Sequence, residues 1–530
     1  MHGPSGNAAP PAAMSAIMVA AMDTGELPMN PDMTAAIARQ DPSAPAERFD
    51  HAFARAAGAS PSEHNDVRLL LDARENFPAW LAAIRAAQRY VLFESYIIAD
   101  DRVGQEFVQA LADKARHGVR VCVIYDWLGS TKNGTVWAQL REAGAQVLGF
   151  NPPSLESPLA WLTRDHRKSI VVDGEVGFVG GLCVSAEWEG DPKKRLEPWR
   201  DTGVEIRGAA VADVESAFAQ VWAACGGNYL ELDRQPVPAD VGNMRVRVIV
   251  GMPNAAGTYR TDLLVASVAR ERLWLTDAYF IATAAYTQAL RAAARDGVDV
   301  RLLVPGASDI PAISPLSRAG YRVLLEAGVR VFEWNGTMLH AKTAVADGLW
   351  SRVGSTNLNV ASWVSNYELD VAIEDPVFAG QMANQFEKDL SRATEIVLTP
   401  RNRVRRTEPR VDIEPEAGGG TRRAVAGSAG RAAAGAASVG SALGAALTNR
   451  RTLGPTEVGL LATVAVIMLG IAVVAALFPR LLAWPIAILA AWLGIAWGFK
   501  GWTLWRGAHH AGRGAHLHDV VPRSEADDGH

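Results

Sequence analysis

The chain has 530 residues, of which 49% are hydrophobic and 21% are charged, and its formal net charge is −5. This length suffices for two core-bearing domains with additional segments. The acidic balance argues against an electrostatic nucleic-acid binder, because such domains are usually basic. Cys122, Cys183 and Cys225 have neither disulfide-framework nor zinc-finger spacing, which favours reduced thiols in the cytoplasm.

The first segment, residues 1–60, is rich in Ala, Pro and Met. Its apolar stretch AAMSAIMVAAM is short and follows no basic residues, so we do not expect a signal peptide. We expect a disordered leader here, with a start codon placed too early as the alternative.

The middle of the chain contains an internal repeat. Three pairs of segments match: RYVLFESYIIAD (89–100) with RLWLTDAYFIAT (272–283), KARHGVRVCVIYD (114–126) with AARDGVDVRLLVP (293–305), and REAGAQVLGFN (141–151) with LEAGVRVFEWN (325–335). Both copies alternate strand-like with helix-like stretches, which requires crossover connections and a parallel or mixed sheet. We therefore predict an α/β fold of two sandwich repeats, 61–232 and 240–400, packed as a pseudo-two-fold dimer.

The last part of the chain changes character twice. Residues 401–455 are basic and rich in Gly and Ala, which predicts a flexible linker; contact with anionic lipid headgroups is the sharper alternative. Two uncharged stretches follow, 458–478 and 481–499, each close to the roughly 20 residues that cross a bilayer. We predict a transmembrane hairpin over 456–500, with both chain termini in the cytoplasm, and a polar tail over 501–530.

Each repeat ends in the same short motif. HRKSIVVDGEVGFVGGLCVS and HAKTAVADGLWSRVGSTNLN both contain H-x-K-x4-D, in register with the repeat: His166, Lys168 and Asp173, and His340, Lys342 and Asp347. We expect these six residues to be the catalytic ones. Side chains two positions apart in a strand point to the same face, so each histidine is expected beside its lysine. The chain has only eight lysines, so two such motifs in register are not an accident of composition.

Two lysines and two imidazoles that converge across a local two-fold axis would bind an anion, and phosphate is the natural candidate. One histidine can attack phosphorus while the other protonates the leaving alkoxide, and an imidazole pKa of about 6.5 suits both roles. The lysines would neutralise the phosphate oxygens, and Ser355 and Asn357 could donate hydrogen bonds. A shared zinc ion is the alternative, but the lysines would repel it, so we expect no metal and no cofactor.

A carboxylate should hold each histidine in the required tautomer. The candidate downstream of His340 is Glu368, in SNYELD, and the candidate downstream of His166 is Asp201, in PWRDTG. Each expected pair thus lies within one repeat. The alternative is that both are ordinary surface carboxylates.

These residues resemble the phospholipase D superfamily and, within it, the bacterial cardiolipin synthases. The resemblance rests on the two H-x-K-x4-D motifs, on GSTN (354–357) and on the N-x-E of Asn366 and Glu368, and it covers roughly residues 65–400. It implies two phospholipase D-like repeats and a phosphohistidine intermediate without a metal. By analogy His166 is the nucleophile and His340 the general acid.

The resemblance also implies a phosphatidyltransferase that moves a phosphatidyl group to phosphatidylglycerol, and the predicted hairpin would tether it to the membrane. A phospholipase D-type hydrolase and a nucleic-acid phosphodiesterase are the alternatives. The resemblance implies phospholipid substrates, and the predicted hairpin adds the membrane as a partner. The acidic balance and the hairpin argue against nucleic acid. The implied location is the bacterial inner membrane, with the catalytic domain facing the cytoplasm.

Two features depart from the family. Cys183 stands where the first repeat usually has Asn, the position that corresponds to Asn357; since a thiol is a weak donor, one phosphate contact is weakened or replaced. Membrane-anchored cardiolipin synthases carry their spans at the N-terminus, whereas the hairpin predicted here is C-terminal.

Overall fold

The computed structural model describes residues 44–130, 133–153, 162–232, 241–310, 313–398 and 404–406, with isolated positions between 469 and 502. The chain divides into two units, Met1–Phe53 and Ala54–His530, and the architecture below is that of the second. The predicted hairpin over 456–500 and the polar tail lie outside the described ranges, apart from those isolated positions. Among the residues so described, no helix combines the length and the apolar character needed to span a bilayer.

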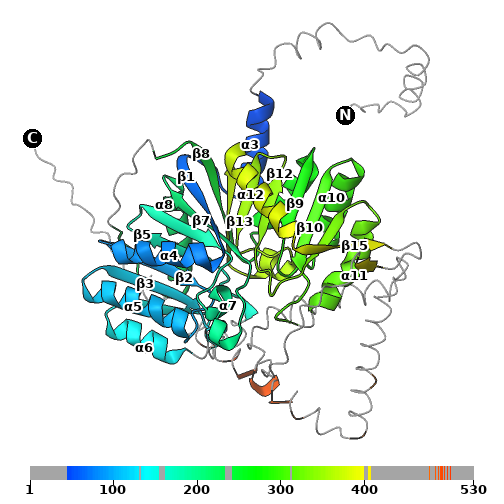
Figure 1. Ribbon diagram of the computed structural model, residues 1–530. Coiled ribbons are helices and arrows are strands. Elements are labelled where there is room, and N and C mark those ends of the chain that lie inside the picture. Colours follow the sequence, from blue (N-terminus) through cyan, green and yellow to red (C-terminus); the bar gives the residue numbers. More distant parts are fainter. Residues whose placement is uncertain are drawn as a thin grey trace, which may run out of the picture. The chain divides into compact units, whose positions relative to one another are not determined.

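The described chain alternates strands and helices twice (Figure 1). The strands of the first half are β1 (Ser62–Leu71), β2 (Tyr90–Ser95), β3 (Arg120–Asp126), β4 (Gln146–Phe150), β5 (Lys168–Val172), β6 (Val176–Gly180) and β7 (Thr202–Arg207). Those of the second are β8 (Met244–Gly251), β9 (Arg272–Thr276), β10 (Asp299–Pro305), β11 (Arg330–Trp334), β12 (Thr343–Ala346), β13 (Trp350–Gly354), β14 (Glu368–Glu374), β15 (Ala393–Leu398) and β16 (Val404–Arg406).

The helices fall between these strands. They are α3 (Ala44–Ala57), α4 (Asp72–Ala86), α5 (Arg102–Arg116), α6 (Gly134–Glu142), α7 (Ala186–Glu189), α8 (Ala210–Ala224), α9 (Gly257–Val268), α10 (Ala284–Arg295), α11 (Ile313–Leu325) and α12 (Pro376–Leu390), with a 3-10 turn η2 (Pro192–Lys194) and a π-helical turn η3 (Ala361–Ser365). Two predictions need correction. Helix α3 lies in the expected disordered leader, where Ala, Glu and Arg favour a helix, and β16 lies in the expected linker.

The strand order relates the two halves. It runs β16-β15-β11-β10-β9-β12-β13-β14-β8-β1-β7-β6-β5-β2-β3-β4. Outward from the central β1–β8 pair, both halves place their first seven strands in the order first, seventh, sixth, fifth, second, third, fourth, and the second half then adds β15 and β16 at its edge. A local two-fold relation produces this order. β2–β3–β4 and β9–β10–β11 pair in parallel and the remaining pairs are antiparallel, so the α/β prediction is confirmed with a mixed sheet.

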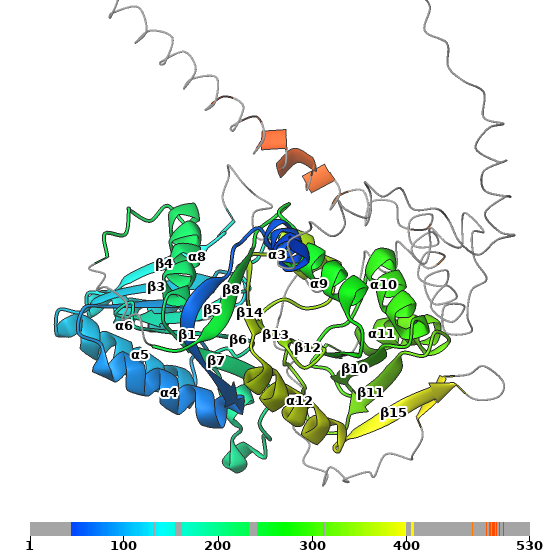
Figure 2. The same ribbon diagram turned by 90° about the horizontal axis from the view of Figure 1, so that it is seen from above.

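Helices cover both faces of each half. In Figure 2, α4, α5 and α6 lie on one side of the first half and α8 on the other, while α9, α10 and α11 lie opposite α12 in the second half. Helix α8 also packs on β8, and α12 on β1, so the last helix of each half contacts the first strand of the other. These exchanged contacts bring the two halves close together.

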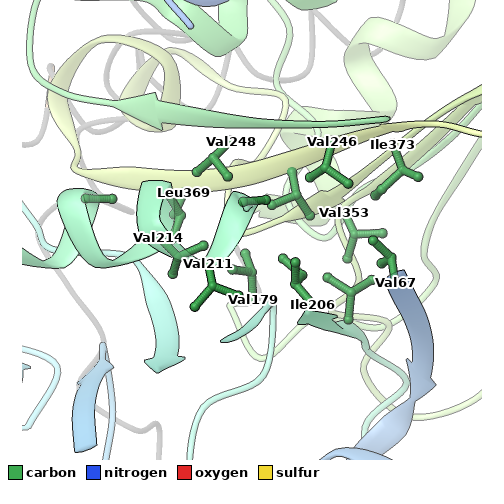
Figure 3. Close-up of a cluster of buried hydrophobic side chains, with 14 of the residues drawn as sticks. Val67, Val179, Ile206, Val211, Val214, Val246, Val248, Val353, Leu369 and Ile373 are labelled. Atoms are coloured by element: carbon green, nitrogen blue, oxygen red, sulfur yellow. The ribbon is translucent and has the colours of Figure 1, made fainter. Parts of the chain in front are cut away.

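One hydrophobic core spans both halves. Figure 3 shows Val179 and Ile206 of the first half close to Val246, Val353 and Leu369 of the second. β6 and β7 lie against β13 and β14 without hydrogen-bonding to them, so their side chains fill the space between. Because burial of apolar surface is the main favourable term in folding, this shared core fixes the ends of β5 and β12, where the motif histidines lie, relative to each other.

Candidate active site

The segment that leads into His166 is paired with a segment of the other half. Asp165 and Tyr367 form a parallel bridge, in which the N–H of Tyr367 donates to the carbonyl of Arg164 at 2.8 Å. The N–H of His166 donates to the carbonyl of Tyr367 at 2.9 Å. His166 is therefore positioned directly beside Glu368, which follows Tyr367 in the chain.

The same pairing occurs at the second histidine. The N–H of Arg200 donates to the carbonyl of Met338 at 2.9 Å, and the N–H of His340 donates to the carbonyl of Arg200 at 2.7 Å. His340 is thereby positioned beside Asp201, which follows Arg200.

The histidine–carboxylate pairs are crossed between the halves. Nδ1 of His166 lies 2.9 Å from Oε2 of Glu368, and Nδ1 of His340 lies 2.7 Å from Oδ2 of Asp201. The prediction that each histidine uses the carboxylate of its own repeat is wrong, because the parallel pairing of segments from opposite halves decides the partner. Both carboxylates are fully buried, so they are not surface groups.

Each carboxylate has its own supporting donors. Ser355 Oγ donates to Glu368 Oε2 at 2.5 Å, and Asn366 Nδ2 donates to Glu368 Oε1 at 3.2 Å. The indole N–H of Trp188 donates to Asp201 Oδ2 at 2.8 Å. Ser355 was expected to bind phosphate, but its hydroxyl proton is directed to Glu368.

The two supports differ because of one glycine. Gly181 and Ser355 each lie 15 residues after their histidine. A Cβ added at Gly181 would approach Asp201 Oδ1 to 2.3 Å, so no serine fits there without moving the carboxylate. Trp188 supplies the missing donor from α7.

The lysines lie inside the site. Nζ of Lys168 donates to the carbonyl of His166, and Nζ of Lys342 donates to the carbonyl of His340 and lies 2.9 Å from that residue's Nδ1. The ammonium of Lys168 is 5.1 Å from the ring centroid of Tyr96, and that of Lys342 is 5.9 Å from the ring of Tyr279.

Tyr96 and Tyr279 were not predicted as site residues. Their rings also flank the imidazoles, with centroids 5.1 Å from His166 and 5.9 Å from His340. The repeat carried the signal, because YVLFESY and LWLTDAY end in the two tyrosines at matching positions.

Burial determines the protonation of the histidines. Burial, aided by Lys168, lowers the pKa of His166 to about 4 even though Glu368 opposes it. Burial and Lys342 lower the pKa of His340 to about 3 against the effect of Asp201. Both imidazoles are therefore neutral near pH 7, unlike the ordinary value expected from the sequence.

Burial and neighbouring charges also shift the pKa values of the lysine and the carboxylates of the site. Burial lowers the pKa of Lys342 to about 8. Burial alone would raise the pKa of Asp201, but His340 and Lys342 lower it to about 2, and His166 likewise lowers the pKa of Glu368. The positive charge of the lysine in the opposite half also lowers the pKa of each histidine. All four groups of the two motifs thus share one site.

The aromatic surroundings of the two histidines are unequal. The rings of Trp188, Trp199 and Tyr279 lie 5.2, 5.6 and 5.9 Å from that of His340. Both tryptophans belong to a longer connection, since 35 residues separate His166 from Asp201 but 28 separate the corresponding pair in the second half. This extra length forms α7 and η2.

Asp173 and Asp347 hold hairpins rather than histidines. The carboxylate of Asp173 accepts the backbone N–H groups of Gln88, Arg89 and Tyr90, each at 2.8 Å. Asp347 accepts the equivalent three N–H groups, of Arg270, Glu271 and Arg272 at the start of β9, at 2.8–3.0 Å. Both aspartates occupy the turn at the far end of the strand that follows the histidine, so the expectation that they act in catalysis is not supported.

Cys183 and Asn357 occupy equivalent buried positions after β6 and β13. Burial raises the pKa of the Cys183 thiol, against the effect of Lys168, so the group stays uncharged. Oδ1 of Asn357 is buried and has no hydrogen-bond partner among the described residues. In the same ranges no cluster of three His, Cys, Asp or Glu side chains is arranged to hold a metal ion.

Two H-x-K-x4-D motifs brought together by paired α/β halves define a phospholipase D-type enzyme. The family model described as cardiolipin synthase, PLD-like domain, matches residues 80–222 and 265–390, and the chain belongs to this family. Cardiolipin synthase A of Pseudomonas aeruginosa (strain PAO1) is 36% identical over 348 residues, which are 65% of this chain and 71% of the relative. Cardiolipin synthase of Geobacillus kaustophilus is 33% identical over 365 residues, 67% and 72% of the two chains.

A solved structure shares the fold. The crystal structure of phosphatidylserine synthase of Haemophilus influenzae Rd KW20 has a TM-score of 0.53 and 15% identity, covering 66% of this chain and 92% of that one. The family model and the cardiolipin synthase relatives confirm the resemblance to the phospholipase D superfamily that the two motifs predicted.

Proposed function

We propose that this enzyme transfers a phosphatidyl group from one phospholipid to the headgroup hydroxyl of phosphatidylglycerol, through a phosphohistidine. The observation that carries the proposal is the pair of crossed histidine–carboxylate contacts around two buried lysines, in a chain similar to cardiolipin synthases. Lysine ammonium groups at this position neutralise phosphate oxygens and stabilise the charge that develops on them.

His166 is suited to attack phosphorus. Its Nδ1 faces Glu368, an ionised acceptor, so the proton sits on Nδ1 and the lone pair on Nε2 is free. When Nε2 bonds to phosphorus, the bond from phosphorus to the leaving headgroup oxygen breaks. Glu368 then stabilises the positive charge of the phosphorylated imidazole.

His340 is suited to supply the proton that the leaving alkoxide needs. It is neutral in the free enzyme because of burial and Lys342, so it must gain a proton with the substrate. A bound phosphodiester is an anion, which offsets the lysines and raises the pKa of His340. Asp201 stabilises the imidazolium through Nδ1.

The second half of the reaction reverses these roles. The hydroxyl of the acceptor lipid gives its proton to Nε2 of His340, its oxygen bonds to phosphorus, and the bond to His166 breaks. His166 returns to its neutral form, and no metal or cofactor takes part in the proposed cycle.

The predicted hairpin over 456–500 would hold this site at the bacterial inner membrane, on its cytoplasmic side. The support is the uncharged character of 458–478 and 481–499 and the basic residues outside both ends. Single cysteines introduced in 501–530 and in the turn at Pro479 test the topology in intact cells. Labelling of the turn, but not the tail, by an impermeant reagent is expected, and the reverse pattern would reject this orientation.

The activity is tested in a bacterial host that lacks its own cardiolipin synthases. Wild-type protein, His166→Ala and His340→Ala are expressed, and lipids are measured by mass spectrometry. We expect cardiolipin only with the wild type. Phosphatidic acid without cardiolipin would identify a hydrolase instead, and unchanged lipids would exclude both activities.

A further inference from the structure

The half-site of His166 is bordered by exposed apolar side chains. Leu162 is 41% exposed and lies four residues before His166 in the chain. Val364 is 39% exposed and lies four residues before the carboxylate that contacts this histidine, and Met252, the residue directly after β8, is 37% exposed. Three separate segments therefore present an apolar side chain close to one half-site.

Backbone hydrogen bonds place these segments side by side. The parallel bridge between Asp165 and Tyr367 aligns the stretches that begin at Leu162 and Val364. Asn254, in the loop that starts with Met252, donates its N–H to the carbonyl of Val364 at 3.1 Å. The three apolar residues thus lie on adjoining segments that lead to or neighbour His166 and Glu368.

The border of the other half-site is basic. The longer connection between α7 and β7 carries Lys193, Lys194 and Arg195, all exposed, in and after η2. The same connection ends at Trp199, whose ring lies 5.6 Å from that of His340. In Figure 1, α7 lies in the lower part of the view, between the two halves.

The acidic residues of this connection are mostly engaged in local contacts. Of the four acidic residues in 186–199, three contact a nearby side chain: Glu187 contacts Ser185 at 2.8 Å, Glu189 contacts Arg102, and Asp191 contacts Lys194 at 3.6 Å. Glu197 is exposed. The tip formed by η2 therefore presents consecutive basic side chains toward solvent.

We propose that this rim, defined as Leu162, Met252, Val364, Lys193, Lys194 and Arg195, docks the enzyme on the surface of an anionic phospholipid bilayer. Apolar side chains that enter the headgroup region together with basic ones that meet anionic headgroups are the two components of interfacial binding. The inference rests on the proposed function, because the substrate phosphate of a membrane lipid must reach two buried histidines. Docking at the rim would bring the lipid headgroup within reach of the two buried histidines.

The test compares two substrates for the full-length protein. Leu162→Ser, Met252→Ser and Val364→Ser are combined, and transfer is measured on long-chain phosphatidylglycerol in vesicles and on short-chain phosphatidylglycerol below its aggregation concentration. We expect the vesicle rate to fall about tenfold or more and the monomer rate to change less than about twofold. An unchanged vesicle rate, or equal losses on both substrates, would overturn the proposal.

The matched control removes apolar residues that are even more exposed but distant from the site. Leu349, 54% exposed, lies in the turn between β12 and β13, and Val377, 66% exposed, lies in the first turn of α12. Leu349→Ser with Val377→Ser should leave both rates unchanged. A vesicle-specific loss in this control would show that general surface apolarity, not the rim, binds the bilayer.

A second readout does not need catalysis. An environment-sensitive dye is attached to Val364→Cys or, as control, to Val377→Cys, with the half-buried Cys225 replaced by Ser. We expect a blue shift only at position 364, larger with anionic than with neutral vesicles, and reduced by Lys193→Gln with Lys194→Gln. Equal shifts at both positions would reject docking at the rim, whereas absence of any transfer by the wild type would reject the proposed function alone.

Discussion

His166 and His340 occupy equivalent positions in the repeat but have different neighbours. Glu368 accepts hydrogen bonds from Ser355 and Asn366. Asp201 accepts one from Trp188 instead, because Gly181 leaves no room for a serine. The two halves also differ at one further equivalent position, where the first half has Cys183 and the second has Asn357. Different neighbours allow equivalent residues to take different roles, nucleophile and acid.

The crossed pairing predicts which histidine responds to which carboxylate. Asp201 raises the pKa of His340, so Asp201→Asn should lower the pKa of His340 and leave that of His166 nearly unchanged. Loss of the proton-holding partner should also lower kcat about 10²-fold or more. NMR titration of labelled histidines measures the first effect, and a shift confined to His166 would contradict the pairing. Trp188→Phe, which removes only the supporting donor, should cost about tenfold.

Lys342 predicts the alkaline limit of activity. Its pKa of about 8 means that the free enzyme loses this charge as pH rises through that value. We therefore expect kcat/KM to fall above about pH 8, and kcat to fall at higher pH because the bound anion raises the pKa of the lysine. Lys342→Arg should move the limit of kcat/KM to higher pH, with a lower maximum. A profile that is flat to pH 10 in the wild type would exclude this lysine as the group responsible.

At the scale of elements, the motif strands work as hairpins anchored at their far ends. β5–β6 and β12–β13 turn at Asp173-Gly174 and Asp347-Gly348, where the aspartates have φ of 55° and 50°. Their carboxylates fasten the turns to the strands that precede them in each half. The H-x-K-x4-D motif therefore combines two reacting groups with one structural group.

The structural assignment predicts a separation of stability from activity. Asp173→Ala or Asp347→Ala leaves three backbone N–H groups without an acceptor, which should reduce the free energy of unfolding by about 1–3 kcal/mol. Activity per folded molecule should persist. Denaturant unfolding and kcat measured below the transition check both statements, and Asp→Asn, which tolerates positive φ, should be milder. A fall in kcat in fully folded protein would show that the aspartates contribute to catalysis and not only to stability.

At the scale of the whole molecule, the shared core makes the site a product of both halves. Arg167 adds to this link, since its guanidinium donates to the carbonyls of Glu368 at 3.1 Å, Gly251 at 3.0 Å and Ala217 at 2.7 Å. The second motif has Ala341 at the position equivalent to Arg167, so only the first motif has a side chain at this position that hydrogen-bonds to the other half. Burial of the histidines in this junction couples folding to pH.

The buried histidines predict loss of stability in mild acid. Their folded pKa values of about 4 and 3 lie below the unfolded value of about 6.5, so the unfolded chain binds more protons between these limits. The free energy of unfolding should fall as pH drops from 6.5 toward 4, by about 1.4 kcal/mol per pH unit for each histidine. Replacing both, His166→Gln with His340→Gln, should remove that slope in urea titrations.

Other buried groups act in the opposite direction and require this matched comparison. Burial raises the pKa of Asp126 and Asp262 to about 6 and that of Asp277 to about 7, so these carboxyls favour the folded state as pH falls through the same range. They are present in both proteins, so the difference between wild type and double variant isolates the histidines. Equal slopes in the two proteins would contradict neutral burial of the imidazoles.

Much of this protein is determined by its sequence. The repeat of strand-like and helix-like segments predicted the α/β class, because periodicity of apolar residues reports which side of an element is buried. The doubled motif predicted the two histidine–lysine pairs and the family, because the side-chain alternation of a strand fixes their common face. Glu368 and Asp201 were also found, from their residue type and their position downstream of the histidines.

Only the tertiary structure decided how these residues combine. The exchange of carboxylates between halves depends on the pairing of Asp165 with Tyr367 and of Arg200 with Leu339, contacts between segments far apart in the chain. The low pKa values of His166 and His340 depend on burial at a junction that no local pattern records. Sequence spacing specifies neighbours along one strand, whereas the chemistry of this site depends on neighbours across two halves.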